Sequence, residues 1–304
     1  MNTHVPDHHG HSSGAAPQHD EAIVMGLVLL LSVAAAVLYG TADFLGGLIS
    51  RRTHYTVVGL IGQAAGALGA TGAALTSNAP LPDGTTLLWG MGAGIGGAVG
   101  TLALYRGLAH GRMNIAGPLS AVTAAGIPVL VDLVFGAHLT TPTTLGICLA
   151  VPGIWLVSSG TGSRRSSGGV GDGLLAGLGF AGLFICLNRA GDLAGLWPVA
   201  TSQVMSAVIL GTVALVSWVA TRRPVTSAPS PWMALWPGVL AVSGTILYFI
   251  ATHKGTLTAA AVLTSLYPAF TVILAALVLR ERTSLLHSVG LALCAASVGA
   301  FVTG

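Results

Sequence analysis

The sequence is poor in charged residues. Only 7% of its residues are Asp, Glu, Lys or Arg, and 12 basic against 9 acidic residues leave a net charge of +3. The basic residues lie in short clusters between apolar runs, so they form no continuous basic surface for nucleic acid. Hydrophobic residues make up 53% of the 304 positions, which excludes an ordinary water-soluble domain. We therefore expect a polytopic membrane protein that has the lipid bilayer as a partner and binds no nucleic acid.

Motifs of the common enzyme and ATPase classes are also missing. No P-loop, HExxH or GxSxG is present, and the GxGxxG-like glycines from Gly92 to Gly97 lie inside an apolar run. The three cysteines, Cys148, Cys186 and Cys294, lie in apolar runs without CxxC spacing. We predict that the protein is not an enzyme and requires no cofactor.

Long apolar runs alternate with short polar breaks from Glu21 onward. Ten of these runs approach or exceed the length of about 20 residues that a helix needs to cross a bilayer. The predicted spans are 22–49, 55–76, 85–109, 114–135, 142–160, 170–189, 197–220, 232–251, 257–279 and 284–302. The predicted fold class is an all-α membrane protein with ten transmembrane helices.

The ninth run carries a proline near its middle and a charged end. Leu257–Arg282 contains Pro268 and finishes in Arg280, Glu281 and Arg282. A proline inside a water-soluble helix costs about 3 kcal/mol, whereas membrane helices accept proline because neighbouring groups satisfy the freed carbonyl. We expect this helix to bend at Pro268 and to be anchored by its charged end.

The chain contains an internal repeat. A shift of 144 residues aligns Thr101–Gly160 with Thr245–Gly304 without a gap, and loop positions agree as well as helix positions. Because five helices per half is an odd number, tandem halves cross the membrane in opposite senses, which gives two inverted five-helix repeats. The predicted organisation is a disordered His-rich tail at 1–20, a first repeat at 21–160, a linker at 161–169 and a second repeat at 170–304.

Three segments carry a family resemblance. They are AAAVLTSLYPAFTVILAALVLRER (Ala259–Arg282) with the later Gly290, YGTADFLGGLISRR (Tyr39–Arg52), and ALYRGLAHGRMNIAGPLSAVTAAGIPVL (Ala103–Leu130). The chain resembles the EamA branch of the drug/metabolite transporter superfamily. The resemblance implies a secondary transporter of small metabolites or amphipathic compounds, with export as the favoured direction, working by alternating access in the bacterial inner membrane.

One feature departs from the family pattern. Where the family often has Glu-Arg after the fourth helix, this chain has Ala137 and His138. A charged cluster is therefore kept in only one half. A symmetrical role for it does not follow from the resemblance.

Ionisable residues inside membrane helices are costly and are candidates for function. Asp43 and Arg106 lie late in the first and third predicted helices, which run in the same direction, so we expect them at similar depth and able to pair. Such a pair could couple transport to protons or bind a cationic substrate. The alternatives are a static ion pair between the helices, or an Arg106 side chain that reaches the interface. Asp132 is either a hydrated interfacial residue or a proton relay.

Other polar side chains at membrane depth could line a substrate cavity, because a few placed polar groups fix the orientation of a ligand. Each could equally satisfy a neighbouring helix. The predicted site contains, besides Asp43 and Arg106, Tyr39, Gln63, Tyr105, Gln203, Tyr248, Tyr267 and Pro268.

The N-terminal tail offers a second hypothesis. His4, His8, His9 and His11 could capture a divalent metal weakly, although a solvated tail explains them as well. A different class of function is therefore a non-transporting membrane sensor or assembly protein with a metal-responsive tail.

Orientation and assembly stay open at the level of sequence. Most arginines lie at odd-numbered loops, and the positive-inside rule then places both termini outside the cell. The family resemblance implies both termini inside. A monomer and a homodimer are both compatible with the sequence.

Overall fold

A computed structural model of the chain describes residues 16–51, 53–110, 113–158, 167–221, 231–278 and 285–302. All regular elements in these ranges are α-helices, as the composition predicted. In chain order they are α1 (Ala16–Ser50), α2 (Tyr55–Thr76), α3 (Gly84–Ala109), α4 (Met113–Val134), α5 (Thr141–Ser158), α6 (Ser167–Arg189), α7 (Trp197–Thr221), α8 (Pro231–Lys254), α9 (Leu257–Thr264), α10 (Tyr267–Val278) and α11 (Leu285–Val302).

Within the described ranges, seven segments are long and apolar enough to cross a membrane. They are Ile23–Ser50, Tyr55–Thr76, Gly84–Ala109, Gly169–Arg189, Trp197–Ala220, Trp232–Lys254 and, with α9 and α10 taken together, Leu257–Val278. Shorter apolar helices lie at Leu119–Val134, Thr141–Val157 and Leu285–Phe301. The chain is therefore a multi-pass, all-helical membrane protein.

The ninth predicted span differs from the prediction because it consists of two helices. α9 ends at Thr264 and α10 begins at Tyr267, so Pro268 is the second residue of a helix. In the first turn a proline costs little, since the N–H that it lacks has no partner within the helix. The cost of a proline in a helix interior therefore does not arise.

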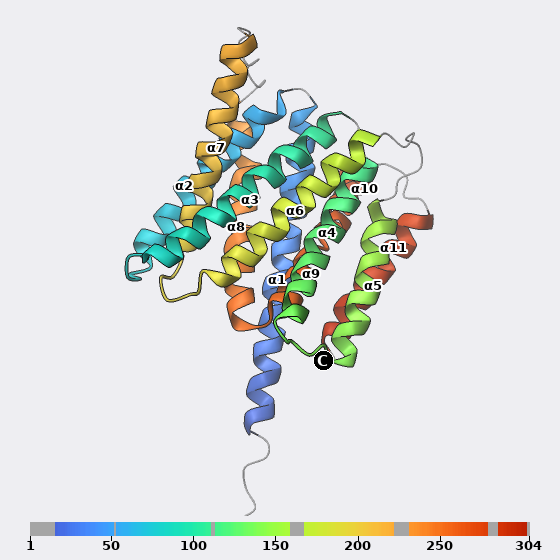
Figure 1. The fold of residues 1–304 in the computed structure, drawn as a ribbon. Helices are drawn as coiled ribbons and strands as arrows, with labels where there is room; N and C mark the ends of the chain where they lie inside the picture. The colour runs from blue at the N-terminus through green and yellow to red at the C-terminus, as the bar shows by residue number, and fades with distance from the viewer. Residues whose placement is uncertain are drawn as a thin grey trace, which may run out of the picture.

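α1 is longer than a bilayer requires. It begins at Ala16, inside the tail predicted at 1–20, and its 35 residues extend about 52 Å at 1.5 Å per residue. The hydrocarbon core is only about 30 Å thick. The first turns of α1 project beyond the rest of the bundle (Figure 1).

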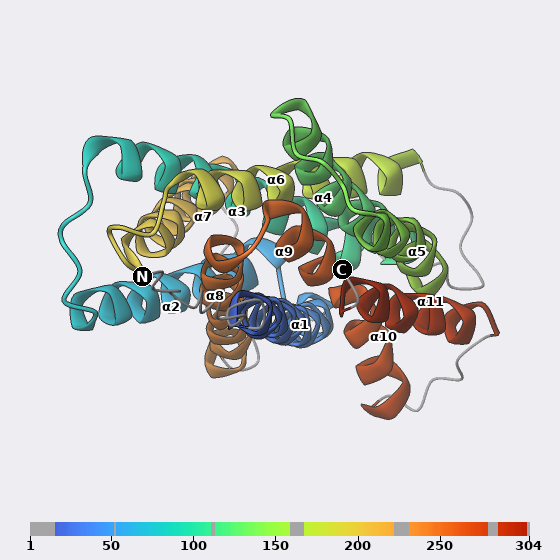
Figure 2. The same ribbon diagram turned by 90° about the horizontal axis from the view of Figure 1, so that it is seen from below.

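The helices pack in pairs that join the two halves of the chain. α3 packs along α6, and α1 packs along α8. The pairs α2–α7 and α5–α11 lie at opposite ends of the bundle, with α1 between them (Figure 2). α1 and α6 run in opposite directions, and α1 begins on the side of the bundle where α11 ends (Figure 1).

Contacts between the halves recur at a spacing of 144 residues. The Gly62 backbone lies directly against Gly238, so a Cβ at position 238 would overlap it. The residues 144 positions away form the matching contact, in which Ser206 Oγ donates a hydrogen bond of 2.6 Å to the Gly94 carbonyl. Both contacts need a residue without a Cβ on one side, because the two backbones approach closely.

The same spacing relates contacts at the other end of the bundle. A Cβ on Gly146 would lie 2.5 Å from the Phe301 ring, and a Cβ on Gly290 would lie 2.5 Å from the Val157 backbone nitrogen. Gly290 and Val157 lie 144 positions from Gly146 and Phe301, respectively. The register found in the sequence therefore also describes how α5 and α11 pack.

Candidate functional site

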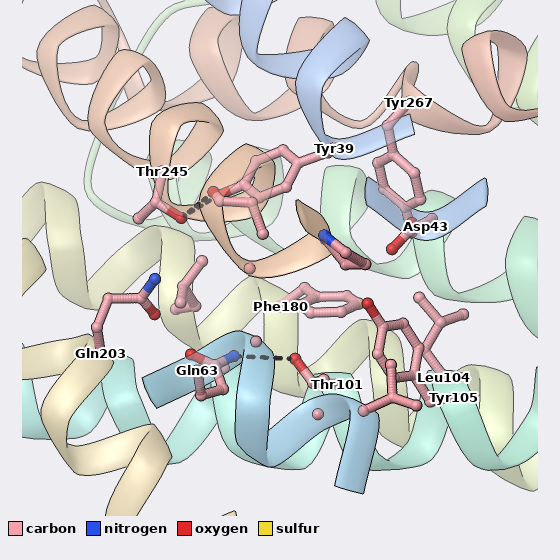
Figure 3. Close-up of a pocket in the computed structure, with 18 of the residues that line it drawn as sticks. Tyr39, Asp43, Gln63, Thr101, Leu104, Tyr105, Phe180, Gln203, Thr245 and Tyr267 are labelled. Atoms are coloured by element: carbon pink, nitrogen blue, oxygen red, sulfur yellow. Dashed lines mark hydrogen bonds between the residues drawn. The ribbon is translucent and has the colours of Figure 1, made fainter. Parts of the chain in front are cut away.

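A cavity lies between the two halves, where α1, α2 and α3 meet α6, α7, α8 and α10 (Figure 3). About 70 Å³ is open to the centres of water molecules, which is room for about five to seven waters. The apolar part of the lining includes Phe180, Leu183 and Phe184 from α6. The polar part consists of Tyr39, Asp43, Gln63, Thr101, Tyr105, Gln203, Thr245 and Tyr267.

The cavity lies toward the ends of α1 and α3 that are followed by basic residues. Asp43 is seven residues before the end of α1 at Ser50, about 10 Å along the helix axis. Arg51 follows directly, and Arg106 lies in the last turn of α3. Arg189 marks the opposite side of the bundle, at the end of α6 (Figure 1).

Two hydrogen bonds fix polar side chains in the cavity wall (Figure 3). The hydroxyls of Tyr39 and Thr245 are 2.7 Å apart, and Gln63 Nε2 donates to Thr101 Oγ1 over 3.4 Å. Thr101 and Thr245 occupy equivalent positions of the repeat, one on α3 and one on α8. The sequence prediction omitted both threonines, although the repeat register together with their polar character could have identified them.

Asp43 lies between two aromatic residues. Figure 3 shows its carboxylate between the Tyr267 and Tyr105 side chains, with the Phe180 ring beside the Tyr105 hydroxyl. The Tyr267 hydroxyl is 2.9 Å from Ser120 Oγ. Within the described residues, Asp43 itself forms neither a hydrogen bond nor an ion pair. A carboxylate in a largely apolar cavity is free to bind a proton or a cation.

The structure brings most of the predicted site residues to this one cavity. They are Tyr39, Asp43, Gln63, Tyr105, Gln203 and Tyr267. Pro268 follows Tyr267 but does not line the cavity. Tyr248 also lies outside the lining, fully buried, and donates from its hydroxyl to the Phe184 carbonyl over 3.1 Å. Tyr248 therefore acts as a packing residue behind the cavity wall.

The predicted pairing of Asp43 with Arg106 is wrong. Arg106 instead donates from Nε to Asp172 Oδ1 over 2.8 Å, and its Nη2 contacts the same oxygen. The reason is the packing of α3 along α6, which brings the guanidinium to Asp172. The Arg106 side chain is 47% exposed and that of Asp172 only 1%. Asp172 was missed, although an aspartate within an apolar run is itself a signal.

Asp132 has a structural partner. Its Oδ2 accepts hydrogen bonds from the Thr258 backbone N–H at 2.8 Å and from the Thr258 hydroxyl at 2.7 Å. The carboxylate thus satisfies the first turn of α9, where N–H groups lack partners within the helix. This geometry supports neither the relay nor the purely hydrated role.

No cluster of three or more His, Cys, Asp or Glu residues that could hold a metal ion occurs in the part of the chain that the structure describes. The weak metal candidates His4, His8, His9 and His11 lie outside the described residues. So do Arg280, Glu281 and Arg282, which were expected to anchor the ninth helix.

Apolar helices long enough to span a membrane surround this cavity, as in a multi-pass membrane protein. Residues 169–303 match the model of the EamA-like transporter family. Sixteen chains of solved structures match the chain. One, titled only "Crystal structure of protein", is 14% identical with a TM-score of 0.68, covering 90% of this chain and 96% of that one. No curated protein matches. These findings confirm the predicted resemblance to the EamA family, which the family model places over residues 169–303, and show that the fold is shared with a solved structure.

Proposed function

We propose that the protein is a secondary transporter that exports small metabolites or amphipathic compounds across a bacterial inner membrane by alternating access, with Asp43 as the coupling group. The observation that carries this proposal is the central cavity, which both halves line and in which Asp43 forms no hydrogen bond or ion pair to a described residue. A proton bound to Asp43 neutralises the carboxylate, and a substrate that displaces the proton takes its place. Tyr39, Tyr105 and Tyr267 are the other titratable groups in the lining.

Ten membrane crossings in two inverted five-helix repeats are the architecture that we propose for this mechanism. The seven long segments support this architecture, and it requires each of the three shorter apolar helices to cross the membrane as well. The opposite directions of α1 and α6 agree with an inverted second half (Figure 1). The recurring contacts at a spacing of 144 residues extend the register to α2 and α7, beyond the aligned sequence from Thr101 onward. Inverted halves of this kind place the substrate site at their interface.

The Arg106–Asp172 ion pair makes the two halves unequal in this scheme. The residues 144 positions away are Ile250 and Val28, which are apolar. One side of the bundle is thus joined by an ion pair and the other by apolar packing. We propose that breaking this pair accompanies the change in access, because α3 belongs to the first half and α6 to the second.

We propose that the side carrying Arg51 and Arg106 faces the cytoplasm, in accord with the positive-inside rule. The cavity lies nearer this side, as expected for a protein that loads substrate from within the cell. Both ends of the chain then lie outside. Labelling of single cysteines placed after Arg51 and after Arg189 with a membrane-impermeant maleimide in intact cells tests the orientation. Labelling of the first site but not the second contradicts it.

The transport proposal is tested in two stages. Metabolites inside and outside cells are compared between a deletion strain and an overexpressing strain, and the compound that accumulates inside the deletion strain is then assayed in proteoliposomes. We expect Asp43→Asn to abolish the pH dependence of transport. Asp192→Asn, at an exposed position in the loop after α6, is the matched control. An Asp43→Asn protein that folds and transports with unchanged pH dependence contradicts the coupling role.

Deletion of residues 1–15 separates transport from a metal-responsive role of the tail. A transporter keeps its activity without this segment, since the cavity is built from α1 onward. A sensor that reads metal through the tail loses its response. The proposed function therefore predicts unchanged transport by the shortened protein.

A further inference from the structure

Several polar groups in the cavity wall are paired within the protein. The Tyr39 and Thr245 hydroxyls are paired with each other, and the Gln63 amide nitrogen donates to Thr101. The Tyr267 hydroxyl is within hydrogen-bond distance of Ser120. The Tyr105 hydroxyl and the Gln203 amide nitrogen, which also line the cavity, form no hydrogen bond to a described residue and remain able to donate.

Three acceptor groups lack partners among the described residues. Gln63 Oε1 is buried and accepts no hydrogen bond from any part of the chain that the structure describes. The Gln203 side chain is only 5% exposed and forms no hydrogen bond to any described residue. The Asp43 carboxylate has neither a hydrogen bond nor an ion pair within the described residues. Because an unsatisfied buried acceptor costs about 1–3 kcal/mol, this set favours a ligand that donates hydrogen bonds.

The charge of the cavity lining also favours a cationic ligand. Asp43 is the one charged side chain among the described residues that line the cavity, and its single negative charge has no basic counterpart there. The rings of Tyr105, Tyr267 and Phe180 lie around it (Figure 3). Aromatic faces attract cations through their quadrupole, and the attraction increases when water is excluded. The ionised Asp43 carboxylate would repel an anionic substrate at this site.

We propose that the cargo of this cavity is a small organic cation with one ammonium group. The inference rests on the proposed function, because it takes the cavity to be the transport site. The ammonium group pairs with Asp43 among the aromatic rings, and a hydrogen-bond donor on the cation satisfies Gln63 Oε1 or Gln203. Protons and the cation then compete for the same carboxylate.

Equilibrium binding to the full-length protein in lipid nanodiscs tests this inference without requiring transport. The probes are choline and n-butylammonium, each measured by titration calorimetry against a neutral analogue of similar shape, 3,3-dimethylbutan-1-ol and 1-butanol. We expect at least one cation to bind about tenfold or more tightly than its neutral analogue, which corresponds to about 1.4 kcal/mol. Asp43→Asn should remove this discrimination, and Asp192→Asn should retain it.

Each outcome decides a different question. Equal binding of both cations and their neutral analogues by the unmodified protein overturns the inference, whether or not the Asp43→Asn protein folds. Discrimination that survives in a folded Asp43→Asn protein also overturns it. Cation binding that depends on Asp43, without uptake of the same cation by proteoliposomes, supports a cation-binding site in the cavity but contradicts the transport function and, with it, the role of the cation as cargo.

Discussion

Asp132 shows how a single side chain can link distant parts of the bundle. Its carboxylate caps the first turn of α9 through Thr258, and Thr256 caps the same turn by accepting from the Ala259 N–H over 3.1 Å. All eight residues of α9 are buried, so water cannot replace these acceptors easily. The negative charge also interacts favourably with the positive end of the helix dipole.

We therefore expect Asp132→Ala to lower the free energy of unfolding by about 1–2 kcal/mol, the usual cost of removing a helix cap. Asp132→Asn keeps an acceptor oxygen of similar shape and should lose less. Thermal unfolding of both variants in the same detergent measures the difference. Equal stability of the alanine variant and the unmodified protein contradicts the capping role.

Asp83 caps α3 on the bundle surface, outside the spanning segment. Its Oδ1 accepts the Thr86 N–H over 2.7 Å, and this hydrogen bond lowers the pKa of the carboxyl below its ordinary value. The ionised form is thus favoured in the folded state. Its stabilising effect is complete above the unfolded pKa, near 3.9, and is lost as the pH falls through the lower folded pKa.

Amide hydrogen exchange in the first turn of α3 should follow this titration. We expect protection of the segment around Thr86 to fall at pH values below about 4, after correction for the intrinsic exchange rate. Asp83→Asn should show weaker protection at pH 6 and no comparable change on acidification. A pH response that is the same in both proteins is evidence against the cap.

At the scale of the helix, hydrogen bonds and close packing stabilise the break between α9 and α10. The Ser265 N–H bonds to the Ala261 carbonyl, and the Ala269 N–H bonds to the Leu266 carbonyl over 2.9 Å, so hydrogen bonds reach both sides of the break. Gly40 on α1 permits the close approach, since a Cβ there would lie 2.5 Å from the Tyr267 carbonyl oxygen. The break therefore positions Tyr267 against α1, beside the cavity.

Replacing only Arg106 and replacing both members of the Arg106–Asp172 ion pair should have different effects on the free energy of unfolding. Removing Arg106 leaves the buried Asp172 carboxylate without its guanidinium. Replacing both residues removes both charges, so that no buried charge is left without its counterpart. We expect Arg106→Gln to cost about 1–3 kcal/mol, less than for a fully buried pair because Arg106 is half exposed. Adding Asp172→Asn to this variant should restore part of the loss. The two single variants and the double variant, compared by thermal unfolding, give the coupling energy.

The comparison of the single and double variants can also contradict a coupling between the two charges. If the double variant is no more stable than Arg106→Gln, the pair contributes no coupling. Transport rates of the same three proteins then show whether the pair also controls access. If the pair must break during transport, it should slow the conformational change that opens the cavity to one side of the membrane. Its removal should then change the transport rate without changing the affinity for substrate.

Much of the bundle follows from the sequence at the scale of the whole molecule. Apolar runs gave most of the helices, and the 144-residue register relates contacts as distant as Gly62–Gly238 and Gly146–Phe301. Periodicity could not indicate that Arg106 faces Asp172, because the choice depends on which faces of α3 and α6 meet. It also could not show that Pro268 begins a helix, since that depends on tertiary contacts to Tyr267.

The domain division predicted from the repeat leads to a test at the same scale. Each half buries its helices against the other, as α3 does on α6 and α1 on α8, so neither half has a complete core alone. We expect residues 1–160 and 161–304, expressed as separate chains, to co-purify when made together. Each chain made alone should be degraded or aggregate. A monodisperse, folded first half in the absence of the second contradicts this division.

The contact between Asp132 and Thr258 also has a consequence for the order of synthesis. The two residues are 126 positions apart, so the carboxylate leaves the ribosome long before its partner exists. Until α9 has been made, the Asp132 carboxylate on α4 lacks the two hydrogen bonds that Thr258 donates to it. Final closure of the bundle then depends on the last quarter of the chain.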